Sequence, residues 1–269
     1  MSQTVTKIGV FYDGGFFQHV SNYYYYNHNR KARIKLTGFH EFIKTMVSEL
    51  ENSDRRLCQI VDSHLFKGRM YAPEIAPAQL YFERVFDDIL MSEGIVTHYL
   101  PYKMTSQGKK QEKGIDVWFA LEAYELCVQK KFDVVALIAA DGDYAPLVRK
   151  INALGSRVMV LSWEFSYTNE QGYEMSTRTA FELLREASYP IFMEKAIDFP
   201  KPHHEELIDN MFSVNTSRRK SSQNLFNESI PDLDDSEHNI DRFHNEELLN
   251  KTNKNSFSEF NQNESFYNQ

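Results

Sequence analysis

The sequence predicts an α/β domain with a Rossmann-like parallel sheet and helices on both faces, followed by a polar C-terminal tail. Strand-like and helix-like segments alternate over the first 200 residues, which is the order of βαβ units with parallel strands. Two strand-like segments, Ile8–Phe11 and Val134–Ala139, are uniformly apolar, as expected of central strands buried on both faces. The composition changes near residue 200, so we assign residues 1–200 to the domain and residues 201–269 to the tail.

The elements of the domain follow from hydrophobic spacing and from turn residues. We expect strands at Lys7–Tyr12, Leu57–Phe66, Ile95–Leu100, Val134–Ala139 and Arg157–Leu161. We expect helices at Phe39–Leu50, Ala76–Glu93, Asp116–Lys131, Tyr144–Leu154 and Thr179–Lys195, the last interrupted at Pro190. The helix Asp116–Lys131 is assigned from an apolar stripe at Val117, Ala120, Leu121, Tyr124 and Val128.

The tail has a composition that opposes folding. Residues 201–269 contain no Gly, Ala, Trp or Cys, and only 17 of the 69 residues are hydrophobic. Such a segment buries too little apolar surface to offset the entropy of ordering, so we expect most of it to be disordered, with a short helix near Glu205–Phe212. It holds seven basic and 13 acidic residues and therefore most of the net charge of −8.

The sequence argues against several classes of protein. Its longest purely apolar run, Val134–Ala140, is far shorter than the ~18 residues of a membrane span. The N-terminus lacks the features of a secretory signal. The two cysteines, Cys58 and Cys127, are too few for a disulfide framework or a zinc ribbon. We therefore expect a cytoplasmic protein without a membrane partner.

Four aspartates stand where the expected central strands end and where a neighbouring helix begins. Asp13 follows the first strand, Asp141 and Asp143 follow Val134–Ala139, and Asp116 opens a helix. Ligands of such sheets bind at the carboxyl ends of the strands. Clustered carboxylates repel one another unless a cation intervenes, and oxygen ligands suit Mg²⁺ or Mn²⁺. Each aspartate also has a purely structural interpretation, because caps and tight turns favour Asp.

These residues lie in motifs that resemble a known family. The motifs are a hydrophobic strand ending at Asp13-Gly14, then Lys113-Gly114-Ile115-Asp116-Val117, Leu137-Ile138-Ala139-Ala140-Asp141-Gly142-Asp143-Tyr144, and Gly155 before Val158-Met159-Val160. Their order and spacing resemble the NYN domain, the LabA-like branch of the PIN-like nuclease superfamily, over about Lys7–Ile197.

The resemblance implies a sheet with central strand order 3-2-1-4-5 and a metal-dependent ribonuclease that hydrolyses RNA phosphodiester bonds. It assigns Asp13, Asp116, Asp141 and Asp143 as catalytic and as ligands of Mg²⁺ or Mn²⁺. Two positions depart from many relatives. Phe16 stands where Asn is common, and Ala139 stands where Ser or Thr is common. Both departures remove polar groups that could orient a ligand or water.

Cations near the aspartates indicate where a nucleic acid would bind, since phosphates need positive charge and bases stack on aromatic rings. We expect single-stranded RNA to contact Gly14, Lys67, Arg69 and Lys113. Lys113 ends a lysine-containing loop that also holds Lys103, Lys109 and Lys110. The tyrosine run Tyr23–Tyr26 would serve base stacking, a homodimer contact or burial against the domain.

Other functions fit less well. A non-catalytic RNA- or nucleotide-binding regulatory module of the same fold is the main alternative. Haloacid-dehalogenase-like phosphatases need a second Asp where Gly15 stands, and a toprim site expects Glu where Asp13 stands. No glycine-rich phosphate loop follows the first strand. In the tail, His203-His204 could hold a transition metal weakly, although chance adjacency explains the pair better.

Overall fold

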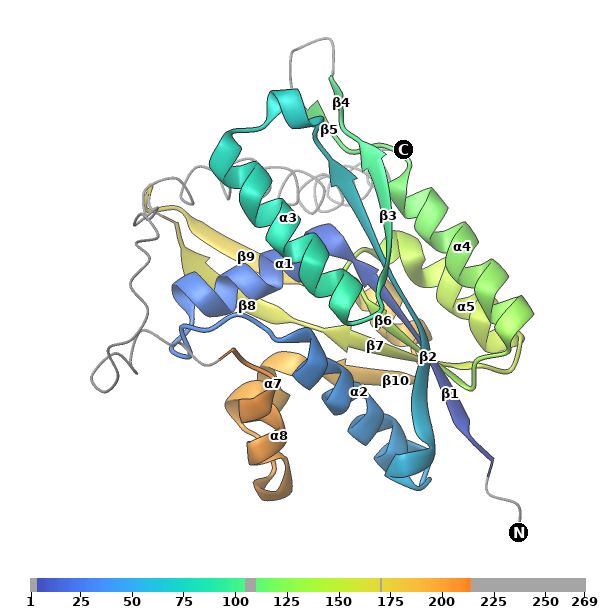
Figure 1. Cartoon of the computed structure of the whole chain (residues 1–269). Coiled ribbons are helices and arrows are strands. Elements are labelled where there is room, and N and C mark those ends of the chain that lie inside the picture. The colour runs from blue at the N-terminus through green and yellow to red at the C-terminus, as the bar shows by residue number, and fades with distance from the viewer. Residues whose placement is uncertain (1–3, 105–109, 170, 214–269) are drawn as a thin grey trace, which may run out of the picture.

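The structure is a computed structural model that describes residues 4–104, 110–169 and 171–213. These residues form a six-stranded parallel sheet in the order β3-β2-β1-β6-β7-β10, with helices around it (Figure 1). The strands are β1 (Thr6–Asp13), β2 (Cys58–Arg69), β3 (Val96–Pro101), β6 (Val134–Ile138), β7 (Arg157–Ser162) and β10 (Tyr189–Phe192). The predicted fold class and the central strand order are confirmed.

Helices cover the sheet on both faces. They are α1 (Gly14–Asn22), α2 (Leu36–Leu50), α3 (Pro77–Ser92), α4 (Ile115–Lys130), α5 (Ala145–Ala153), α6 (Phe181–Glu186), α7 (Met193–Asp198) and α8 (Glu205–Asn210). Helices α4 and α5 pack on one face, and α1, α2, α3, α7 and α8 pack on the other (Figure 1). Helix α6 contributes Leu183 to the core beneath α4 and α5. Two antiparallel hairpins complete the fold: β4 (Lys103–Met104) with β5 (Lys110–Gln111), and β8 (Glu164–Thr168) with β9 (Glu174–Arg178).

The buried middle of strand β1, Ile8–Tyr12, is apolar because it contributes to two cores. Ile8, Val10 and Tyr12 point into the core beneath α1 and α2, whereas Phe11 points into the core beneath α4. Successive side chains of a strand leave on opposite faces, so a strand covered on both sides needs apolar residues at every position. This explains why the two uniformly apolar segments occupy adjacent central places in the sheet.

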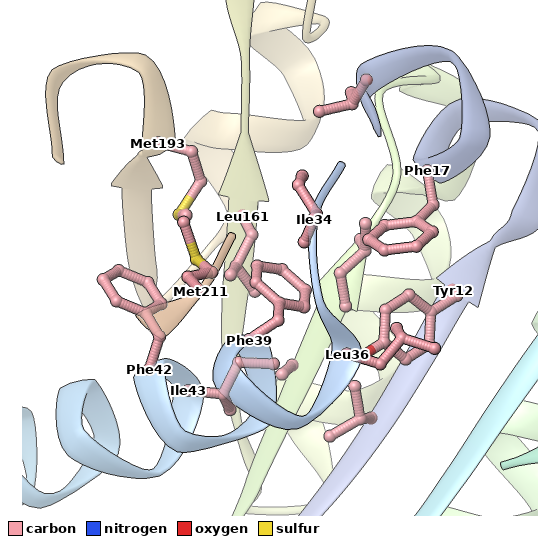
Figure 2. Close-up of a cluster of buried hydrophobic side chains, with 14 of the residues drawn as sticks. Tyr12, Phe17, Ile34, Leu36, Phe39, Phe42, Ile43, Leu161, Met193 and Met211 are labelled. Atoms are coloured by element: carbon pink, nitrogen blue, oxygen red, sulfur yellow. The ribbon is translucent and has the colours of Figure 1, made fainter. Parts of the chain in front are cut away.

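Aromatic residues dominate the core beneath α2. Phe39 is fully buried, and its ring centroid lies 6.1 Å from that of Tyr12 and 5.9 Å from that of Phe17. Figure 2 shows Phe42 beside Met193 and Met211 at the other side of the same cluster. Met211 comes from the segment after α8, so the C-terminal end of the described chain is part of this core.

The polar C-terminal segment is packed further than its composition indicates. The short helix expected near 205–212 is present as α8, and Ile208 and Met211 on this segment are fully buried. The backbone N–H of Lys35 donates to the carbonyl of Met211 at 2.8 Å. The packed chain therefore continues beyond the boundary at residue 200 that the composition indicates. The rest of the expected tail, residues 214–269, lies outside the described residues.

Replacing Gly38 by Ala is expected to destabilise the protein by about 2 kcal/mol, as overpacking does. Gly38 lies in the first turn of α2, and an added Cβ would lie 2.1 Å from the carbonyl oxygen of Asn210 in α8. The backbone of the segment would have to move away. Urea unfolding measures the change. Gly15→Ala is the matched control, because it also adds a methyl group to a first helical turn but meets only Asp13 Oδ1 at 3.4 Å. Equal stabilities of the two variants would contradict the close approach of α2 to the Asn210 backbone at Gly38.

The segment Thr179–Lys195, for which one interrupted helix was expected, forms two short helices on either side of strand β10. Pro190 lies in β10, which is the edge strand beside β7. Proline has no N–H to donate to a neighbouring strand. An edge strand needs no such donor on its outer side, so proline is tolerated there. The prediction of one helix was wrong because Pro190 belongs to a strand that separates two helices.

Most of the apolar stripe used to assign helix α4 faces the solvent, and only Ala120 of it packs against the core. Val117 and Leu121 are 64% and 65% exposed. The buried side of α4 carries Ile115, Phe119 and Ala123. Both sets of residues have helical spacing, so periodicity predicts the helix without selecting the face that packs.

Within the described ranges, no helix combines the length and the apolar character needed to span a bilayer.

Candidate functional site

The site lies where the chain reverses its direction of progress across the sheet. Strand β1 pairs with β2 on one side and β6 on the other, and Tyr12 is in register with Ile138. The chain proceeds from β1 outward to β3, and later from β6 outward to β10 on the other side. This is the switch point at which α/β sheets bind ligands. Asp13 and Asp141 both follow these neighbouring strands at that edge.

Two of the four aspartates are held by backbone groups of the turns that they begin. Asp13 caps α1, and its Oδ1 accepts a hydrogen bond from the Phe16 N–H at 3.0 Å. Asp141 precedes the 3₁₀ turn Gly142–Tyr144, and its Oδ1 accepts from the Asp143 N–H at 2.9 Å. Each carboxylate thus has a defined orientation at the end of a buried strand.

Asp116 does not cap its helix. The N-cap of α4 is Gly114, whose φ of 90° requires the left-handed conformation that Gly adopts most readily. Asp116 lies in the first turn, where Oδ1 accepts a hydrogen bond from the Tyr144 hydroxyl at 3.0 Å. The structural interpretation of Asp116 as a cap therefore fails, and the residue is bound to a side chain from the Asp141 turn.

Tyr144 joins Asp116 to the turn that Asp141 begins. Its side chain is buried and packs against Phe119. Burial, and then the charges of Asp13, Asp116 and Asp141, raise the pKa of the Tyr144 hydroxyl well above its ordinary value. The phenol is therefore a neutral donor at physiological pH. Sequence reasoning missed this residue, although it directly follows the Asp-Gly-Asp motif.

The four aspartates do not yet have the spacing of a closed metal centre. Across the described part of the chain, no three of them bring one carboxylate oxygen each within 4.8 Å of one another. Asp143 is exposed, unlike the other three aspartates, which are partly buried. Their donor chemistry nevertheless fits a hard divalent cation, since all the ligands are oxygen. Such a cation would offset the repulsion that keeps like charges apart.

The two departures from the motif are apolar packing positions. The Phe16 ring is buried and meets Trp163 edge-on, with ring centroids 5.8 Å apart. Ala139 is fully buried in the core beneath α4. Only the backbone N–H of Phe16 reaches the site, through its bond to Asp13. Neither side chain brings a polar group to the aspartates.

The expected substrate-binding residues have different environments. Gly14 is buried where α1 meets β2. The two elements approach so closely there that an added Cβ would lie 2.9 Å from Lys67 Cβ and from the Phe66 carbonyl oxygen. Lys67 is itself buried, and its Nζ donates to Gln18 Oε1 at 2.6 Å. Burial lowers the pKa of Lys67. Lys67 thus faces the interior beside the turn that follows Asp13.

Arg69 and Lys113 lie closer to the solvent. The Arg69 guanidinium donates to Asp87 at 2.7 Å and lies 4.6 Å from the centre of the Tyr99 ring. Lys113 is exposed and stands directly before Gly114 at the start of α4. Lys109, from the same expected loop, lies outside the described residues. Lys113 is therefore the one of the four that is exposed.

The tyrosine run is used for packing within the domain. Tyr23 stacks on Phe165 of β8 with ring centroids 3.9 Å apart, and Tyr24 is buried. The Arg33 guanidinium lies 4.6 Å from the Tyr25 ring and 5.6 Å from the Tyr26 ring. Burial against the domain, one of the interpretations of this run, thus accounts for Tyr23 and Tyr24 in particular.

Comparison with known proteins decides the family. A family model for the NYN domain matches residues 7–194, more than half of the chain. The chain belongs to the NYN family. The NYN match starts within β1 and ends within α7, so it includes all six strands of the sheet and all four aspartates. NYN domains belong to the PIN-like nuclease superfamily, so this chain has a nuclease-type fold.

A solved structure shows a more distant likeness. It is the crystal structure of a protein of unknown function from Vibrio parahaemolyticus, with 19% sequence identity and a TM-score of 0.45 to this NYN protein. The similarity covers 72% of this chain and 96% of that chain. Among curated proteins, none matches the sequence.

Proposed function

We propose that this NYN protein is a divalent-metal-dependent nuclease that hydrolyses phosphodiester bonds of single-stranded RNA. The observation that carries the proposal is the placement of Asp13 and Asp141 after neighbouring central strands, with Asp116 joined to the Asp141 turn through the Tyr144 hydroxyl. Caps and turns account for Asp13 and Asp141 taken singly, but they do not account for Asp116, which is hydrogen-bonded to the Tyr144 hydroxyl. Membership of a family that generally consists of nucleases supports the hydrolase class.

In this proposal the four aspartates hold Mg²⁺ or Mn²⁺. When bound, the ion would lower the pKa of a coordinated water and neutralise charge on the scissile phosphate. The hydrogen bonds to backbone N–H groups fix Asp13 and Asp141, and the Tyr144 hydroxyl fixes Asp116. Asp143 is exposed and would complete the ligand set from the solvent side.

RNA would approach over the start of α4. Lys113 is exposed three residues before Asp116, and we propose that it contacts a phosphate next to the scissile bond. Gly14 lets α1 pack closely against β2 and so sets the position of Asp13. Lys67 and Arg69 would support the site without touching the RNA directly, because Lys67 is buried and Arg69 is hydrogen-bonded to Asp87.

The proposal is tested with the full-length protein and a labelled single-stranded RNA in Mn²⁺, with EDTA as the control. Cleavage that needs Mn²⁺ and stops with EDTA is the expected result. A single-stranded DNA of the same sequence, assayed in a separate reaction, shows whether cleavage requires the 2′-hydroxyl. Metal binding measured by calorimetry, combined with an uncut RNA after hours, would contradict the nuclease.

The same negative result would favour the second candidate, a regulatory NYN domain that binds RNA or a nucleotide without cutting it. Phe16 and Ala139 favour this candidate, since neither supplies the polar side chain that is common at these positions in the family. It predicts RNA binding in the presence of the metal with no product. A cytoplasmic location and a homodimer remain predictions from the sequence.

Replacing Tyr144 by Phe is expected to raise the Mn²⁺ concentration for half-maximal cleavage by a factor of about 10–100. Residues that orient metal ligands commonly contribute this much to metal affinity. The hydroxyl donates to Asp116, and Phe keeps the packing against Phe119 while it removes this bond. A Mn²⁺ titration of the cleavage rate measures the shift. An unchanged titration curve would show that Tyr144 does not position Asp116 for metal binding.

A further inference from the structure

A compact group of metal-binding side chains lies away from the aspartates. Glu49 is in the last turn of α2, and His203 and His204 end the 3₁₀ turn Pro202–His204. Nε2 of His204 is 2.6 Å from Oε1 of Glu49, and Nε2 of His203 is 3.6 Å from the same oxygen. Among the residues that the structure describes, this is the one trio of His, Cys, Asp or Glu with a ligand atom from each within 4.8 Å of the others.

The trio lies at the opposite edge of the sheet from the aspartates. Helix α2 leads through a short turn into the start of β2, so its C-terminal end lies at the amino edge of the parallel strands (Figure 1). Asp13 and Asp141 lie at the carboxyl edge. The two groups are therefore separate sites, and the inference about the trio does not depend on the nuclease proposal.

The distances of the trio are close to those of a tetrahedral metal site. Metal–ligand bonds of about 2.0–2.1 Å place tetrahedral ligand atoms about 3.3 Å apart. The two separations, 2.6 Å and 3.6 Å, lie on either side of this value, and the shorter one is a hydrogen bond that an ion would replace. Two imidazole nitrogens with one carboxylate oxygen form a donor set that suits zinc and neighbouring transition metals. The His203 side chain is 63% exposed, which leaves room for water as a fourth ligand.

The local charge also favours a cation. The C-terminal end of a helix carries partial negative charge, and the last turn of α2 has Glu49 but no basic residue. The acidic residue that follows the helix, Glu51, is already paired with Arg157. The histidines are therefore the groups placed to balance Glu49, either by hydrogen bonding or by sharing an ion with it.

We propose that Glu49, His203 and His204 bind a Zn²⁺ ion, and that this ion fastens residues 202–212 to α2. His204 is buried and already held against Glu49, so two of the ligands are preorganised. The segment that the ion would fasten contributes Ile208 and Met211 to the core beneath α2. Zinc would thus control how firmly the last packed segment is held.

Co²⁺ titration of the metal-free full-length protein tests the site, because the visible spectrum of Co²⁺ distinguishes tetrahedral from octahedral coordination. We expect one equivalent to give a tetrahedral spectrum that Zn²⁺ displaces. His203→Ala alters an exposed side chain and should weaken this binding by about 100-fold, at least as much as the loss of an outer-shell partner. Glu49→Gln keeps an acceptor for His204 and should weaken it as well. Asp141→Asn is the control that should retain the tetrahedral site.

Two results would overturn the proposal. One is an octahedral spectrum that His203→Ala leaves unchanged, and the other is a tetrahedral spectrum lost only in Asp141→Asn. Hydrogen exchange tests the fastening separately. Zn²⁺ should slow amide exchange in residues 205–212 of the parent and have no such effect in His203→Ala. Binding of Zn²⁺ without slower exchange would contradict the fastening.

Discussion

Replacing Asp141 by Asn should lower RNA cleavage by about 1,000-fold or more, because it removes a charged ligand of the ion that supports the reaction. The fold should remain intact. Asp141 accepts the Asp143 N–H through Oδ1, and the amide oxygen of Asn can accept the same bond. The rate of cleavage in Mn²⁺ measures the effect, and urea unfolding confirms that stability is retained.

The chain offers a close control for this substitution. Asp54 precedes the 3₁₀ turn Arg55–Leu57, and its Oδ1 accepts the Arg56 N–H at 2.9 Å, the same local arrangement as at Asp141. Asp54→Asn should cleave at the parent rate. If both variants lose activity equally, the loss comes from substituting an aspartate that caps such a turn, and not from the removal of a metal ligand. If Asp141→Asn cleaves as fast as the parent, the site assignment is wrong.

The aspartates should not contribute equally. Asp13 and Asp116 are partly buried and oriented by a hydrogen bond, as Asp141 is, so their Asn variants should show losses of similar size. Asp143 is exposed. Its Asn variant should therefore retain more activity than the other three. Equal loss in all four would indicate that the metal-bound site draws Asp143 inward.

The edge of the sheet at which the aspartates lie could be predicted from the sequence. The apolar runs of β1 and β6 identify central parallel strands, and the residues that follow such strands must emerge at one edge. The bond between Tyr144 and Asp116 could not be predicted in this way. It joins residues 28 apart in the chain and depends on how α4 and the 3₁₀ turn pack together.

Packing also explains what the sequence misses elsewhere. Helix α4 has apolar residues on two sides, and the side with Phe119 is buried while the side with Leu121 is exposed. The segment around Ile208 is polar on average, yet a few apolar residues anchor it to α2. Local patterns indicate which residues can be buried. The partner surface decides which of them are buried.

Acidification is expected to destabilise the protein through His40. Burial lowers the pKa of this imidazole from 6.5 to about 4, and Lys44 adds to the effect while Glu93 opposes it. His40 is 9% exposed, and its Nε2 has no hydrogen-bond partner among the described residues. The unfolded chain therefore binds a proton that the folded chain excludes. Stability should fall as the pH drops from 6.5 to 4, by about 3 kcal/mol in total.

The contribution of His40 can be isolated with His40→Gln, which stays neutral at every pH. Urea unfolding free energies of both proteins are compared between pH 7 and pH 4. Carboxylate titrations affect both proteins and cancel in the difference, so the parent should lose about 3 kcal/mol more than the variant. The sign of this difference is decisive. If Glu93 instead held His40 charged in the folded state, the folded pKa would be raised, and acidification would stabilise the parent relative to the variant.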